Sequence, residues 1–145
     1  MLPESIELQI VTPERHVLQE TVKSVEIPGK EGYLGILPGH APLITELGIG
    51  ILAYRKGDEN HFVTVIHGYA EVLPDRVIVL AEISERAEEI DVERSRAAHD
   101  RAQAELAKAG VGGDQWQREK LALDRALVRM QAAARTGATA GGSHQ

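Results

Sequence analysis

The feature that most constrains this 145-residue chain is a change in the spacing of its apolar residues near position 90. Before that position, apolar and polar residues alternate with a period of two, as in the segments 6–10 and 62–66. Such alternation indicates strands that bury one face. After Ile90, apolar residues recur at helical spacing instead. The change predicts two units of different secondary structure within one chain.

The first unit, residues 1–86, is predicted to be an all-β domain. Turn-forming glycine and proline separate its alternating segments, at positions 28–30, 38–39, 56–60 and 73–76. Many short strands with no helical segment among them favour a β-sandwich, in which two sheets bury their inner faces against each other. The run Val77–Leu80 is apolar throughout and predicts a strand buried on both faces.

The second unit, residues 87–135, is predicted to be a hairpin of two helices. Asp91 can cap a helix from Val92 to Ala109, because an aspartate oxygen accepts bonds from the free amides of a first turn. Glycines at 110, 112 and 113 interrupt the pattern before a second helix that reaches about Arg135. This second helix carries an apolar stripe, made of Trp116, Leu123, Leu127, Met130 and Ala134.

Alanine dominates the first of these helices, which limits how strongly the hairpin can pack. Alanine favours helix but buries little apolar area. We therefore expect the hairpin to be held weakly, close to a balance between docked and released positions. The final ten residues, 136–145, are rich in Gly, Ala and Thr and predict a disordered tail.

Composition excludes several classes of function. The net charge of −6 argues against nucleic acid as a partner. The chain has no cysteine, and no apolar run reaches the roughly 20 residues of a membrane helix, so we expect no direct membrane insertion. Residues 1–84 carry 12 acidic and 6 basic side chains, whereas residues 94–145 carry 5 acidic and 9 basic ones. The positive second unit should be attracted to acidic surfaces.

Patterns that carry enzyme chemistry are missing from the sequence, which has no Gly-x-x-x-x-Gly-Lys-Ser/Thr loop, no Gly-x-Ser-x-Gly elbow and no His-Glu-x-x-His. Three histidines leave one alternative open, because His40, His61 and His67 together have the chemistry of a three-histidine metal site. A free-standing β-sandwich enzyme or metal-binding module is therefore the alternative function. The acidic run 82–91 is interpreted as a solvated linker before a helix N-terminus.

One segment carries a more specific signal, the stretch Gly32-Tyr33-Leu34-Gly35-Ile36-Leu37-Pro38-Gly39-His40-Ala41-Pro42-Leu43. Together with Ile10–Glu14, Thr64–Val72 and Val77–Ala81, in that order, it resembles the epsilon subunits of bacterial rotary (F-type) ATP synthases. The likeness covers nearly the whole chain. It implies a sandwich of about ten strands followed by two helices, and a non-catalytic rotor subunit of the central stalk that couples proton flow to ATP synthesis.

The resemblance also implies partners and a location. The sandwich would be held by the gamma subunit and rest on the c-subunit ring, at the cytoplasmic face of the bacterial plasma membrane, as a peripheral protein. The positions that match the family's contacts with gamma and the c ring are Tyr33, His40 and Pro42. The hairpin would permit ATP hydrolysis when folded and inhibit it when extended into the alpha/beta catalytic head. Basic residues that would then meet the beta subunit are Arg118, Lys120, Arg125, Arg129 and Arg135.

A regulatory ATP site is a further implication of the resemblance, although no cofactor is required. Some members bind ATP through an Ile/Leu-Asp-x-x-Arg-Ala motif, and this chain reads Ile90-Asp91-Val92-Glu93-Arg94-Ser95, with serine in place of the alanine. The matching positions are Glu85, Ile90, Asp91, Arg94, Arg101, Arg125 and Arg129. Two of these arginines are four residues apart on one helical face, and guanidinium groups suit phosphate oxygens. Salt bridges within the helices are the alternative interpretation.

Overall fold

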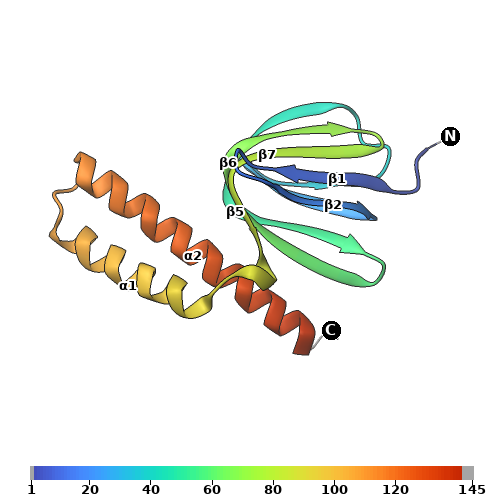
Figure 1. The fold of residues 1–145 in the computed structure, drawn as a ribbon. Helices are drawn as coiled ribbons and strands as arrows, with labels where there is room; N and C mark the ends of the chain where they lie inside the picture. The colour runs from blue at the N-terminus through green and yellow to red at the C-terminus, as the bar shows by residue number, and fades with distance from the viewer. Residues whose placement is uncertain (1, 142–145) are drawn as a thin grey trace.

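The structure, a computed structural model, describes residues 2–141, with the side chains described as far as Arg135. Figure 1 shows two parts: a layered body of strands and, to one side of it, a pair of helices that projects away from the strands. The body ends with Arg86, the last residue of the seventh strand. The predicted architecture of a β-sandwich followed by a helical hairpin is confirmed.

Seven strands form one continuous sheet that folds over on itself. They are β1 (Ile6–Val11), β2 (His16–Val22), β3 (Ser24–Gly29), β4 (Gly32–Ile36), β5 (Leu43–Lys56), β6 (Glu59–Leu73) and β7 (Arg76–Arg86). Their order across the sheet is β2-β1-β7-β6-β5-β3-β4. Each neighbouring pair is antiparallel except β1 and β7, which run parallel.

The expected count of about ten strands is wrong, because three long strands pass through a sharp bend without breaking. On β6 the core-facing side chains are Val63 and Val65 before the bend, and Ala70 and Val72 after it. This change from odd to even positions occurs at His67, which has a φ of 56°, and at Gly68. β5 and β7 bend beside it, so each of the three strands serves both layers.

The sandwich core is built almost entirely from aliphatic side chains of all seven strands. It contains Leu8 and Ile10 from β1, Leu52 from β5 and Val79 from β7, all of them fully buried. Tyr54 is the aromatic side chain in this cluster. Close-packed interiors of this kind deform little. The sandwich is therefore the rigid part of the molecule.

A short 3-10 turn and two helices follow the sandwich: η1 (Ala87–Glu89), α1 (Val92–Lys108) and α2 (Asp114–Gly141). Asp91 caps α1 as predicted, because its Oδ1 accepts a hydrogen bond from the Arg94 amide at 3.1 Å. The two helices lie side by side and antiparallel (Figure 1). No helix within residues 2–141 is long and apolar enough to cross a membrane.

The second helix is longer than expected. Its backbone continues past Arg135 to Gly141, through part of the segment for which the sequence predicted a disordered tail. The segment 136–141 contains glycine at 137, which costs about 1 kcal/mol relative to alanine, but it has no proline, so a helix already formed can propagate through it. The remainder of that predicted tail, 142–145, lies outside the described residues.

The buried face of α2 also differs from the predicted stripe. Ala126, Val128 and Ala132 are buried, whereas Leu127 and Ala134 are exposed. Trp116, Leu123 and Met130 are half-buried. The reason is that α2 packs against two partners, α1 and the strands, which meet different faces of the helix. A single stripe at heptad spacing describes only one of these contacts.

Candidate functional site

The candidate site is the region where the hairpin meets the sandwich. A second apolar cluster, separate from the sandwich core, joins them there. We call it the docking seam, and it consists of Ile51, Ile66, Ala87, Ile90, Val128 and Ala132. Ile51 and Ile66 lie on the outer face of the sheet. Ile51 follows the bend in β5, and Ile66 comes just before the bend in β6. The seam thus connects three parts of the chain: sheet, η1 region and α2.

The docking seam is narrow. Of the α2 side chains that the structure describes, up to Arg135, Val128 and Ala132 are buried in the seam, with Ala133 at its edge. The contacts of the hairpin with the sheet come mainly from the later part of α2, while α1 packs on α2. In Figure 1 the first half of α2 and the tip of the hairpin project away from the strands. Few buried side chains therefore hold the hairpin to the sandwich.

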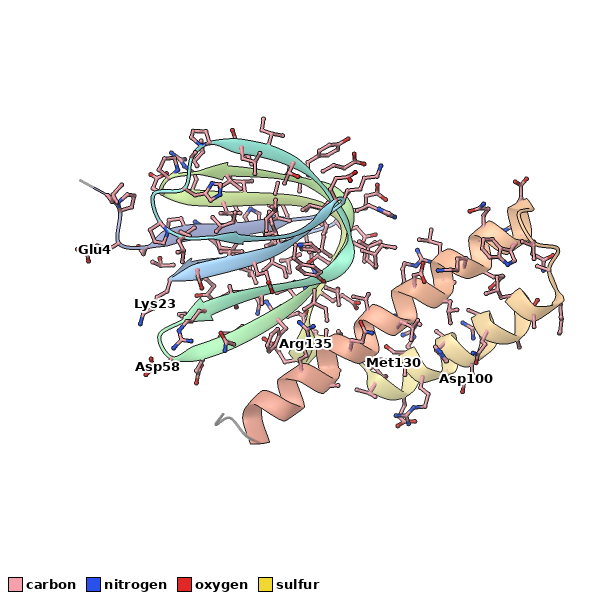
Figure 2. All side chains as sticks on the ribbon, turned by 180° about the vertical axis from the view of Figure 1, so that it is seen from behind. Glu4, Lys23, Asp58, Asp100, Met130 and Arg135 are labelled. Atoms are coloured by element: carbon pink, nitrogen blue, oxygen red, sulfur yellow. The ribbon has the colours of Figure 1, made fainter. Side chains whose placement is uncertain are left out.

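A bidentate ion pair reinforces the docking seam. Arg129 Nε lies 2.7 Å from Glu85 Oε1, and Arg129 Nη2 lies 2.9 Å from Glu85 Oε2. Both side chains are mostly buried, with 29% and 26% of their surfaces exposed. Farther along the helix the Arg135 guanidinium lies over the Phe62 ring, 5.8 Å from its centre. Figure 2 labels Arg135 on the part of α2 beside the strands. Charge-assisted contacts therefore fix the register of α2 on β6 and β7.

The residues predicted to bind ATP lie around the same junction. Because α1 and α2 form an antiparallel hairpin, the first turn of α1, with Arg94, lies beside the part of α2 that carries Arg125 and Arg129. Arg101 is about two turns farther toward the hairpin tip. Arg94 and Arg101 are exposed, and Arg125 is half-buried.

Three other predicted members of this set already have structural partners. Glu85 holds Arg129, Asp91 caps α1, and Ile90 is buried in the docking seam. Glu85 and Arg129 thus form a salt bridge between β7 and α2, which differs from the alternative of salt bridges within the helices. Ser95, the departure from the family motif, is fully buried, and its Oγ donates to the Asp91 carbonyl at 3.0 Å. The serine hydroxyl is thus satisfied within the helix and adds no unpaired polar group.

The basic residues predicted to meet the beta subunit are partly engaged inside the chain. Lys120 Nζ donates to the Asp124 carboxylate at 2.8 and 3.0 Å, one turn along α2. Arg129 and Arg135 face the sandwich, as described above. Arg118 is exposed near the start of the helix. The docked hairpin therefore directs two of the five predicted cations toward the sandwich instead of outward.

The three residues predicted to contact gamma and the c ring lie toward opposite ends of β4 along the chain. Tyr33 is near the start of β4, whereas His40 and Pro42 follow its end. The Tyr33 ring is half-exposed, and its hydroxyl accepts a hydrogen bond from the Ile51 amide at 3.0 Å. That amide is free because the β3–β5 ladder is interrupted between Glu26 and Gly29. Tyr33 therefore has a structural role at this gap, beside whatever else it contacts.

An exposed apolar surface, not predicted from the sequence, covers the outer face of the sheet near the β1–β2 turn. We call it the outer apolar patch, formed by Val11, Pro13, Tyr69 and Leu80. Tyr69 and Leu80 are cross-strand neighbours, and each is 56% exposed. The sequence predicted that Val77–Leu80 would be buried on both faces, but within this chain Leu80 is not covered. In a strand, Leu80 points to the face opposite Val77 and Val79, and this alternation was the signal from which its exposure could have been predicted.

The three-histidine alternative is not supported by the described residues. His61 stacks on Tyr54 with ring centres 5.0 Å apart, His67 lies at the bend of β6, and His40 is in the loop before β5. Within residues 2–141, no group of three or more His, Cys, Asp or Glu side chains is arranged to hold a metal ion. The separation follows from the bend, which turns β6 between His61 and His67.

Sequence reasoning missed two features of the junction for different reasons. The docking seam had a signal, since Ile51 and Ile66 are apolar residues on strands whose other faces already fill the core. The ion pair between Arg15 and Glu89 had none, because 74 positions separate its partners. The acidic run 82–91 is also more than a solvated linker, because Glu85 and Glu89 each hold an arginine.

Comparison with known proteins gives consistent results along the chain. Residues 5–87 match the family model of the ATP synthase delta/epsilon chain β-sandwich domain, and residues 88–134 match that of the long alpha-helix domain. The ATP synthase epsilon chain of Solibacter usitatus is 48% identical over 113 residues, which are 78% of this chain and 84% of that one. The epsilon chain of Syntrophobacter fumaroxidans is 45% identical over 135 residues, 93% and 100% of the two chains.

Solved structures show the same likeness. A chain in the mitochondrial ATP synthase of Euglena gracilis, a structure comprising OSCP, F1 and c-ring, matches with a TM-score of 0.78 and 25% identity. The match covers 92% of this chain and 84% of that one. A chain in the central stalk and c-ring structure from Tetrahymena thermophila matches with a TM-score of 0.54 and 14% identity, covering 88% and 96%. The latter likeness concerns the fold alone.

Proposed function

The chain belongs to the ATP synthase delta/epsilon family as an epsilon chain, and we propose that its hairpin restrains ATP hydrolysis by leaving the sandwich. The chain is a non-catalytic subunit of the central stalk, which turns as proton flow is coupled to ATP synthesis. One observation carries the proposal. Among the side chains that the structure describes, as far as Arg135, the hairpin is held by a seam that buries Val128 and Ala132 from α2 and by one bidentate ion pair.

The sandwich binds the gamma subunit and the c ring in this proposal, and the outer apolar patch supports a protein partner there. Contiguous exposed apolar residues on a rigid sheet are typical of interaction surfaces. Tyr69 and Leu80 stand on strands fixed by the core beneath them, so they can be buried by a partner without rearrangement. Tyr33, His40 and Pro42 remain proposed contacts at the two ends of β4.

A matched pair of substitutions tests this surface. Leu80→Glu places a charge in the outer apolar patch, and Val111→Glu places one at another exposed apolar position, in the hairpin loop. We expect the first variant to lose co-purification with gamma and the second to keep it. Equal retention of gamma by both variants would contradict the assignment of this face.

The inhibitory role is tested in the assembled complex. A chain ending at Ile90 lacks both helices but keeps the whole sandwich, whereas a chain ending at Arg135 keeps the docking seam and the hairpin. We expect ATP hydrolysis by the complex to rise several-fold with the shorter chain and to change little with the longer one. Unchanged hydrolysis with the shorter chain would reject the inhibitory role.

ATP is the proposed regulatory ligand of the folded hairpin. Arg94, Arg125 and Arg129 come from two helices at one junction, and guanidinium groups recognise phosphate oxygens well. Because Arg129 pairs with Glu85 in this structure, a phosphate group recognised by Arg129 must share or replace that contact. Ligand present at ~100 times its dissociation constant stabilises the bound form by ~2.7 kcal/mol, enough to favour the docked hairpin over the released one.

A fluorescence titration tests ATP binding. Trp116 is in the first turn of α2 and outside the docking seam, whereas Phe62 packs against the seam, so Phe62→Trp in a Trp116→Phe background gives a better probe of docking. We expect a saturable change in emission with ATP. The change should vanish in Arg94→Gln and persist in Arg96→Gln, a neighbouring arginine that lies outside the motif and faces Glu93. A response that both variants keep would contradict the proposed site.

The chain itself is proposed to lie at the cytoplasmic face of the bacterial plasma membrane, as a peripheral member of the complex. Curated relatives from Solibacter and Syntrophobacter support a bacterial setting. Cell fractionation tests this, since the chain should sediment with membranes and be released together with the catalytic head when that head is detached.

A further inference from the structure

The start of the hairpin is tied to the sandwich by a second ion pair, away from the docking seam. Arg15, in the β1–β2 turn, donates from Nη1 and Nη2 to the two carboxylate oxygens of Glu89 in η1, at 3.1 and 2.7 Å. This hydrogen-bonded arginine holds the pKa of Glu89 below its ordinary value of 4.5. The contact joins η1 to a turn of the sandwich and does not involve either long helix.

Arg86 adds to this anchor from the end of β7. Its Nε and Nη2 both donate to the Val17 carbonyl of β2, at 3.0 and 2.7 Å. Its own amide donates to Glu89 Oε1 at 3.2 Å, so the Glu89 carboxylate joins the β1–β2 turn to the first residue before η1. Ala87, the next residue, is buried in the docking seam. Residues 86–89 are therefore tied to the sandwich by hydrogen bonds that involve neither α1 nor α2, while Ala87 also packs against α2 in the docking seam.

Asp91, two residues later, belongs to the helix instead. Its Oδ1 accepts from the Arg94 amide, and its carbonyl accepts from both the Ser95 amide and the Ser95 Oγ, each at 3.0 Å. These bonds move with α1. The hydrogen bonds that tie the chain to the sandwich thus end at Glu89, and those within α1 begin at Asp91. Ile90 lies between them, with its amide bonded only to the nearby Ala87 carbonyl, at 3.2 Å.

We propose that the hairpin turns about the Ile90–Asp91 linkage when it leaves the sandwich, while η1 stays fixed to the sandwich through Arg15 and Glu89. The proposal rests on the proposed function, which supplies the release itself. Release then breaks the Glu85–Arg129 pair and the α2 part of the docking seam, but leaves the Arg15–Glu89 pair intact. Ala87 remains on the sheet beside Ile66 when Val128 and Ala132 depart.

Paired crosslinks distinguish this pivot from one nearer β7. The chain has no cysteine, so introduced cysteines are the only thiols. Arg15→Cys with Glu89→Cys bridges turn and η1, and the matched control, Glu85→Cys with Arg129→Cys, bridges β7 and α2. Each pair is closed with a short bismaleimide in the full chain. Hydrogen exchange of the α2 amides then measures how readily the helix is released.

We expect the 15–89 crosslink to leave α2 exchange within about twofold of the same variant without crosslinker, and the 85–129 crosslink to slow it at least about tenfold. Equal slowing by both crosslinks would overturn the pivot, as would slowing by neither. Exchange is read on the isolated chain, so this result does not depend on inhibition. Failure of the inhibitory role is instead seen in hydrolysis by the complex carrying the truncated chain.

A measurement without substitutions gives a second test. The Ile90 amide belongs to the anchored side of the proposed pivot, and the Ser95 amide to the moving side. If a variant fails to fold, native-state hydrogen exchange of the unaltered chain still decides the matter. Exchange of η1 and Ile90 at the slow rate of β7, with faster exchange in α2, supports the pivot. Exchange of residues 87–90 together with α2 contradicts it.

Discussion

The sandwich and the hairpin bury different kinds of side chain, and this difference explains their mechanical roles. Fully buried Leu8, Ile10 and Leu52 fill the sandwich core between layers. The hairpin instead buries Ser95 and Ala102 on α1 and Ala126 on α2. Because stabilisation scales with buried apolar area, the sandwich resists deformation and the hairpin can separate at low cost. One chain thus combines a rigid body with a part that can move.

The largest expected effect is at the bend of the sandwich. Gly68 has a φ of 135°, and a Cβ added there would collide with the Leu80 carbonyl and Ala81 of β7. Gly68→Ala should therefore destabilise the sandwich by more than about 4 kcal/mol. Gly57→Ala is the matched control, since Gly57 also has a positive φ but open space around it. It should cost about 1–2 kcal/mol in urea unfolding. Similar losses at both positions would contradict this view of the bend.

A smaller pair of substitutions compares the core with the docking seam directly. Leu52→Ala empties a fully buried core position and should cost the sandwich roughly 2–5 kcal/mol. Val128→Ala removes two methyl groups from the docking seam and should weaken docking by about 1.6 kcal/mol. The sandwich unfolding midpoint in urea should fall only for Leu52→Ala. A comparable fall for Val128→Ala would mean that the two parts unfold as one unit.

The Glu85–Arg129 pair should contribute less, because both side chains retain contact with solvent. A double-mutant cycle of Glu85→Gln and Arg129→Gln, read from α2 hydrogen exchange, is expected to give a coupling energy of about 1 kcal/mol. Added salt should reduce it. The Lys120–Asp124 pair within α2 is the control, and neutralising it should leave docking unchanged. A coupling energy near zero for Glu85 and Arg129 would show that this pair does not stabilise the docked hairpin.

The smallest effect is the pH dependence of the Arg15–Glu89 pair. The folded pKa of Glu89 is lowered, so its stabilising contribution is present above its ordinary pKa of 4.5 and is lost as pH falls through the folded value. Both side chains are more than a third exposed, which limits the contribution to about 0.2–1 kcal/mol. Urea unfolding of wild type and Glu89→Gln should differ at pH 7 and converge at low pH. A difference that persists at low pH would contradict the assignment.

Sequence reasoning identified the first part as all-β and the second as helical, because the period of the apolar residues distinguishes strands from helices. It also located the Asp91 cap, since capping is a local interaction. The count of about ten strands came from the family resemblance, and it is too high because β6 passes through the bend at Gly68 without breaking. The buried face of α2 was predicted incorrectly. Val128 and Ala132 are buried because they contact the sheet, and the spacing of apolar residues within the helix does not reveal that contact.

The junction was the least predictable part of the candidate site. Glu85 and Arg129 were both selected as functional residues, but their mutual pairing depends on how the hairpin folds back on β7. Arg15 was not selected at all, because only the folded sheet brings the β1–β2 turn beside Glu89. Contacts between residues far apart in sequence carry no periodic signal, whereas periodicity is the basis of the other predictions.

Native-state hydrogen exchange across increasing urea tests the central claim most directly, because it gives an opening free energy for each segment of the isolated chain. The account predicts that amides of α2 open with a free energy clearly below that of β1, β6 and β7, and independently of them. A single opening free energy shared by the helices and the sandwich strands would contradict it.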